Sequence, residues 1–184
     1  MELKDFSSCV STSQKTCAKI LNEILQDTHD YLATYPESVR KGFFSADNVS
    51  PKKFVCAHYE YAARLCRYWD RVAEHLLEIG KWMQECDANM DSEAVLRCDA
   101  TLTKGREFRS ALDQYLTQSE ALLQTENFLP QLHKQTQRFL FATEQFQLFF
   151  TSGNILTQTE NFSIIATRET AYNIQNGGDG SVLA

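Results

Sequence analysis

The chain has 184 residues, of which 43% are hydrophobic and 23% are charged, and its formal net charge is -6. This length suits a single domain with a substantial core, and this composition excludes wholesale disorder. The chain contains no cluster of lysine and arginine, which argues against nucleic acid as a principal partner because phosphate contacts require such clusters.

Only seven glycines and three prolines interrupt the chain, which favours long helices over many short strands. The first predicted helix covers residues 12–35, where apolar residues recur at intervals of three and four and Pro36 follows. Residues 37–49 form the next connection, and we expect a single turn near Val39 within it.

The longest predicted helix covers residues 50–86 and begins at the pair Ser50-Pro51, which suits a helix N-terminus. It would run about 50 Å. Read in sevens, it carries four apolar or aromatic rows, so apolar side chains cover more than half of its circumference. We therefore predict that other helices pack against helix 50–86 on more than one side and that it occupies the centre of the bundle. One row is aromatic and consists of Phe54, Tyr61, Tyr68, His75 and Trp82.

Two more helices are predicted over residues 92–124 and 130–151, separated at Pro130. Gly105 marks an expected kink or break in the first of them. The second contains five phenylalanines between residues 139 and 150, which either lie inside a bundle or leave an apolar patch for a partner.

Residues 160–175 fit either a strand or a helix. We predict a helix, because a lone strand in a helical chain has nothing to pair with. The expected fold is therefore all-α, a bundle of four to five helices around the long helix 50–86. We expect residues 1–175 to form one domain and residues 176–184 to be a flexible tail.

The six cysteines form no Cys-x-x-Cys pair, and Cys56, Cys66 and Cys86 lie along one predicted helix, too far apart to bridge one another. Reduced thiols are typical of the cytosol. No apolar signal core follows Met1, and no apolar run approaches the length of a membrane span. We therefore expect a cytoplasmic protein.

Partner binding is the strongest functional interpretation of the aromatic residues, because tyrosine and tryptophan combine large apolar area with a polar group. The competing interpretation is that another helix of the same chain covers them. The candidate partner-binding residues are Tyr61, Tyr68, His75 and Trp82 on the long helix, and Phe141 and Phe150 on the phenylalanine-rich segment.

Catalytic and metal-binding patterns are weak. His75 invites a phosphotransfer hypothesis, but Glu78 stands where such sites carry lysine and would repel a phosphate. His58 and Cys66 are eight residues apart and form no metal-binding pair, so we expect His58 to be a hydrogen-bonded core histidine. No metal or other cofactor is expected.

The sequence favours a non-enzymatic protein-interaction module, such as an adaptor, regulator or assembly subunit, that acts through apolar and aromatic helix faces. A homodimer or a separate protein partner would cover the surplus apolar surface. The first alternative is a bundle with an internal pocket for an apolar or aromatic small molecule, lined by Trp69, Trp82, Phe139 and Phe146. An enzyme or phosphotransfer domain is the second alternative.

Overall fold

A computed structural model describes residues 3–42, 51–85 and 92–151. These residues contain five α-helices and no strand. The helices are α1 (Leu3–Ala33), α2 (Glu37–Arg40), α3 (Pro51–Glu85), α4 (Ser92–Leu123) and α5 (Phe128–Thr151). The all-α prediction is therefore confirmed for the described part of the chain. The predicted helix 160–175 and tail 176–184 lie outside it, so the domain organisation stays a prediction.

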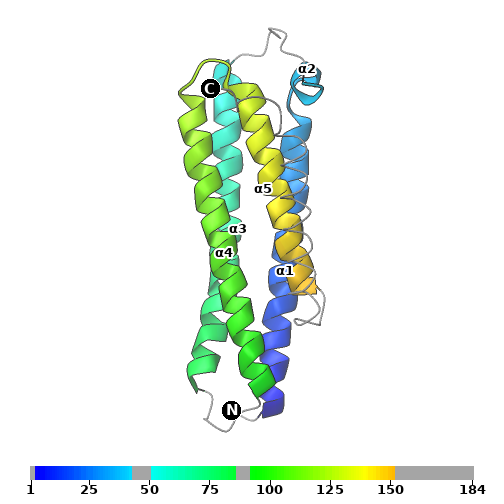
Figure 1. The fold of residues 1–184 in the computed structure, drawn as a ribbon, viewed down its shortest axis with the longest axis vertical. Helices are drawn as coiled ribbons and strands as arrows, with labels where there is room; N and C mark the ends of the chain where they lie inside the picture. The colour runs from blue at the N-terminus through cyan, green and yellow to red at the C-terminus, as the bar shows by residue number, and fades with distance from the viewer. Residues whose placement is uncertain (1–2, 43–50, 86–91, 152–184) are drawn as a thin grey trace, which may run out of the picture. The chain divides into compact units, whose positions relative to one another are not determined.

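The four long helices form a bundle in which each packs chiefly against two neighbours (Figure 1). Both α1 and α4 contact α3 and α5, and each long helix runs opposite to the one before it. The short helix α2 packs against α5. The helices thus pack mutually, and the structure shows no single central helix where the sequence predicted one.

Helix α3 matches the predicted long helix 50–86 closely, but it is covered less completely than expected. Its buried side chains recur at intervals of three and four and form one stripe: Phe54, His58, Tyr61, Leu65, Trp69, Val72, Leu76 and Ile79. Elsewhere on the helix Tyr59 is 48% exposed and Leu77 is 66% exposed. Two neighbours bury one stripe, so part of the apolar circumference of α3 remains accessible.

Helix α1 begins well before residue 12, where the sequence pattern placed its start. Val10, Ser13 and Cys17 are buried and continue the apolar spacing towards the N-terminus. Near this end of the bundle Val10 packs with Ile79 of α3 and Cys98 of α4. The sequence pattern placed the start near residue 12 because Ser11 and Thr12 suit an N-cap, but Thr12 instead donates to the Ser8 carbonyl within the helix.

The two C-terminal long helices differ from the prediction at two points. Helix α4 continues through Gly105 without a break. Helix α5 starts at Phe128 rather than at Pro130, because proline is tolerated in the first turn, where its missing N–H is not needed. Asn127, just before it, adopts a positive φ of 56°, which lets the chain turn between the two helices.

Two chemical features bear on the setting of the protein. No helix in the described ranges is long and apolar enough to cross a membrane. No disulfide joins the cysteines that the structure describes.

Candidate functional site

The predicted partner-binding residues of α3 are buried to different degrees. Tyr61 is fully buried, whereas Tyr68, His75 and Trp82 are half-buried. The pKa of Tyr68 is raised, chiefly by burial and then by the carboxylate of Asp27 on α1, which places this ring at the α1–α3 seam.

The two predicted residues of α5 do not join them. Phe150 is buried with its ring 5.3 Å from that of Phe149, whereas Phe141 is 38% exposed. The six residues therefore lie on two helices that are diagonal in the bundle and form no common surface. Their role in partner binding stays a prediction, and Tyr61 and Phe150 are not accessible in this conformation.

A buried hydrogen-bond network connects all four long helices at the end of the bundle where α1 finishes. Its members are Thr28 and Tyr31 of α1, Tyr35 just after α1, His58 and Tyr61 of α3, Tyr115 and Ser119 of α4, and Thr136 of α5. All eight are less than a tenth exposed. The prediction that His58 is a hydrogen-bonded core histidine is confirmed.

The network determines the tautomer of His58. The Ser119 hydroxyl donates its proton to the Leu116 carbonyl, so it must accept from His58 Nε2, which lies 3.0 Å away. Nδ1 then carries no proton and accepts from the Tyr31 hydroxyl at 2.8 Å, and Tyr31 accepts from Tyr35 at 3.4 Å. Burial lowers the pKa of His58 to about 4, so the ring is neutral at pH 7.

Two threonines complete the network in the same way. Thr28 and Thr136 each donate to the carbonyl four residues earlier, so they accept from Tyr61 and Tyr115, both at 2.7 Å. Burial raises the pKa of both tyrosines well above the ordinary value. A fully bonded, neutral and buried network of this kind specifies helix register, so we interpret it as structural.

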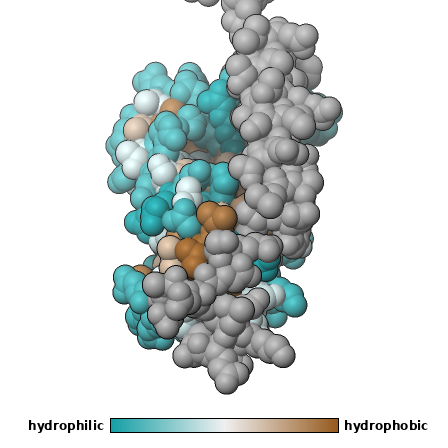
Figure 2. Space-filling view, turned by 60° about the horizontal axis from the view of Figure 1, so that its bottom comes forward, coloured by the Kyte–Doolittle hydropathy of each residue, from teal (hydrophilic) through white to brown (hydrophobic). Residues whose placement is uncertain are grey.

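An open groove runs between α3 and α4 beyond the network, towards the C-terminus of α3. We call it the α3–α4 groove, and its volume is about 710 Å³. Its lining residues are Trp69, Ala73, Leu76, Leu77, Gly80, Lys81, Met83, Gln84, Leu102, Gly105, Arg106 and Arg109. The volume lies within the range of ligand-binding clefts. Figure 2 shows one hydrophobic cluster on a face that is otherwise largely hydrophilic among the residues coloured there.

Two glycines give the groove its form, for different reasons. A Cβ atom on Gly105 would lie 2.4 Å from Leu76 Cδ1, so this glycine lets the Leu76 side chain pack tightly against α4. A Cβ atom on Gly80 would meet no atom within 4 Å and would point into open space. Gly80 therefore leaves room above α3 that no described side chain of the bundle fills.

The ionisable residues that line the groove are all basic. Arg109 donates to Asp113 at 2.7 Å, and its guanidinium carbon lies 5.4 Å from the centroid of the Trp69 ring. Lys81 and Arg106 form no ion pair with any described residue. The groove thus combines an apolar floor with a cationic rim in a chain whose net charge is -6.

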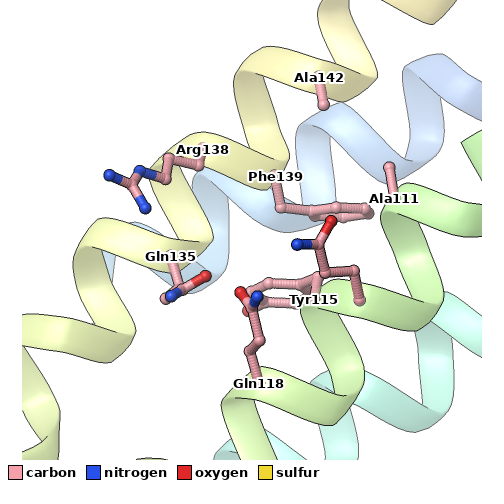
Figure 3. Close-up of a pocket in the computed structure, with 8 residues that line it drawn as sticks. Ala111, Tyr115, Gln118, Gln135, Arg138, Phe139 and Ala142 are labelled. Atoms are coloured by element: carbon pink, nitrogen blue, oxygen red, sulfur yellow. The ribbon is translucent and has the colours of Figure 1, made fainter. Parts of the chain in front are cut away.

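A smaller pocket lies between α4 and α5 and has a volume of about 230 Å³. Its floor is the stacked pair Tyr115 and Phe139, with ring centroids 4.7 Å apart, and polar side chains including Gln118, Gln135 and Arg138 surround it (Figure 3). The pocket is below the usual size of a small-molecule site, so the larger α3–α4 groove is the stronger candidate.

Three of the four residues predicted to line an internal pocket, Trp69, Phe139 and Phe146, lie in a packed region of the core, whereas Trp82 packs against the cluster of Val10, Ile79 and Cys98. The Phe108 ring lies between the first three of these rings, at centroid distances of 5.9, 6.3 and 5.0 Å. Trp69 also lines the open α3–α4 groove. No group of three or more histidine, cysteine or acidic residues suited to a metal ion occurs in the residues described.

The sequence signal for the groove was present but was interpreted differently. Trp69 and Leu76 belong to one apolar row of α3, and the adjacent row is Tyr59, Cys66, Ala73 and Gly80, whose last two members are small. Large side chains beside small ones on a helix surface produce a groove when no neighbouring helix covers the small side chains. The chain matches none of the protein families, curated proteins or solved structures with which it was compared.

Proposed function

We propose that this protein is a non-enzymatic interaction module, an adaptor, regulator or assembly subunit, whose docking surface is the α3–α4 groove. The supporting observation is an apolar groove that the described side chains of the bundle leave open, with Leu77 66% exposed at its side and open space above Gly80. Exposed contiguous apolar surface on a folded domain marks interaction sites.

The energetic argument comes from Gly80. A glycine in the middle of a helix costs about 1 kcal/mol relative to alanine. Packing explains Gly105, since a side chain there would collide with Leu76, but the bundle makes no corresponding use of Gly80. A partner that enters the open space above Gly80 would explain why the helix carries this residue.

The competing functions have less support in the arrangement of side chains. Among the described residues, the groups of the buried network are neutral and inaccessible, which gives an enzymatic reaction no reactive group there. His75 is half-buried with its Nδ1 atom 3.8 Å from the Glu78 carboxylate, so a phosphoryl group would meet a negative charge. We keep the cytoplasm as the proposed location, because Cys56 and Cys66 are exposed thiols.

The test uses two leucines of equal exposure. Leu77 lines the groove and is 66% exposed, whereas Leu96 of α4 is 65% exposed and lies outside the groove lining. A photo-crosslinking amino acid is placed at Gln84, another groove residue, in the wild type, Leu77→Asp and Leu96→Asp proteins. Cross-linked proteins from source cells are identified and purified, and direct binding is then measured.

We expect a cross-linked partner whose affinity Leu77→Asp weakens at least about tenfold, or about 1.4 kcal/mol, whereas Leu96→Asp leaves it unchanged. Both leucines are exposed, so neither change is expected to unfold the bundle, and helical circular dichroism checks this. Equal effects of the two substitutions, or no specific cross-link from the groove, would refute the proposed docking surface.

A further inference from the structure

We infer that the occupant of the α3–α4 groove is an acidic amphipathic helix of another protein. This inference rests on the proposed function and adds the chemistry of the partner. The apolar lining of the groove selects an apolar helix face, and its basic residues select negative charge on the flanks of that face.

The dimensions of the groove favour a helix. On α3 its lining extends from Trp69 to Gln84, which at the helical rise is about 22 Å, or four turns. The walls are two α-helices, whose backbone amides and carbonyls are bonded within each helix. An extended peptide would therefore find no backbone partners, whereas a helix satisfies its own and presents side chains at i, i+4 and i+7.

The positions of the basic residues favour a helix over a lipid. Arg109 lies over Trp69 but is paired with Asp113, so the basic lining residues without an ion pair to a described residue are Lys81 on α3 and Arg106 on α4. Positive charge is therefore present on both walls of the groove. A single-headed anionic amphiphile would neutralise one wall only, whereas acidic residues on both flanks of a helix would reach both.

A second copy of this chain is a less suitable occupant. Outside the groove lining, the exposed large apolar side chains of the described helices include Phe141 and Leu148 of α5, at 38% and 52% exposure. A contact between this pair and the groove of another copy would join two different surfaces. Such heterologous contacts extend into open assemblies unless their rotation closes a ring.

The experiment uses the full chain and synthetic helical peptides of about 16 residues, with leucine at i, i+4, i+7 and i+11. One peptide has glutamate on both flanks of the leucine face, and the other has lysine at the same positions. Binding is measured by fluorescence anisotropy at low and high salt. Lys81→Glu/Arg106→Glu reverses the charge of the groove, and Lys53→Glu/Arg67→Glu makes the same net change at exposed positions of α3 outside it.

We expect the wild type to bind the glutamate peptide at least about tenfold more tightly than the lysine peptide, with a preference that weakens in high salt. The groove variant should invert this preference, and the control variant should keep it. Equal binding of both peptides would overturn the acidic partner but leave the docking surface intact. If the photo-crosslinking residue at Gln84 gives no specific cross-link in the wild type, the proposed function itself is overturned.

Three other outcomes also overturn the inference. Binding of neither peptide, alongside a specific Gln84 cross-link, would exclude a helical occupant. Binding of phosphatidylserine vesicles that requires Lys81 and Arg106, with no peptide binding, would assign the groove to a lipid. Concentration-dependent self-association that Leu77→Asp abolishes would assign it to a second copy of the chain.

Discussion

Protonation of His58 should destabilise the bundle in mild acid. Its ring is 2% exposed and both nitrogens are hydrogen-bonded, to Tyr31 and to Ser119. Burial lowers its pKa from 6.5 to about 4. The folded protein therefore resists protonation of this ring, whereas the unfolded chain accepts the proton near pH 6.5.

The sign and magnitude of the stability change follow from this difference between the folded and unfolded pKa values of His58. The folded-state pKa is lower than the unfolded one, so the contribution of His58 is complete above pH 6.5 and is lost as pH falls towards 4. At about 1.4 kcal/mol per pKa unit, the full loss is about 3 kcal/mol. Between pH 7.5 and pH 5 the expected loss is about 2 kcal/mol, because the folded ring is still mostly neutral at pH 5.

Urea unfolding at pH 7.5 and pH 5 measures this loss in the wild type and in His58→Gln, which has no ionisable ring. Between the two pH values, the free energy of unfolding of the wild type should fall by about 2 kcal/mol more than that of His58→Gln. Thr28→Val is the control, since it removes a neutral partner of Tyr61 from the same network and should cost the same at both pH values. An equal pH dependence of wild type and His58→Gln would refute the assignment of His58 as a buried neutral ring.

Three further results are expected. Gly80→Ala should raise the free energy of unfolding by about 1 kcal/mol, whereas Gly105→Ala should lack this gain because its methyl group meets Leu76; urea unfolding checks both. Thr136→Val should cost about 1–3 kcal/mol in the same assay, because it leaves the buried Tyr115 hydroxyl without its acceptor. Burial raises the pKa of Cys17 to about 12, so a thiol reagent should modify the exposed Cys66 in the native protein and reach Cys17 only after unfolding.

The helices of this protein were largely predictable because their signal is local. Helix α3 follows the predicted limits of 50–86, since its apolar spacing is unbroken over that length. The start of α1 was missed, because Ser11 and Thr12 suit an N-cap, whereas in the structure the helix continues through both and Thr12 donates to the Ser8 carbonyl.

The buried network was predictable only in part. His58 was expected to be hydrogen-bonded, but its partners Tyr31 and Ser119 come from two other helices. Thr28 and Ser119 are polar residues at apolar-face positions of their helices, a signal that could have indicated a buried polar layer. Which hydroxyl meets which ring depends on how the helices align, and spacing within one helix carries no information about that.

The sequence by itself determined that this chain forms long helices, because hydrophobic periodicity and proline placement act within each helix. Tertiary structure alone decided which apolar rows are covered. Each long helix has two main neighbours. The two neighbours of α3 are α1 and α4, which cover the stripe from Phe54 to Ile79 and leave the adjacent row with Ala73 and Gly80 at an open groove. Burial is a property of neighbouring helices, so the proposed docking surface emerged only from their arrangement.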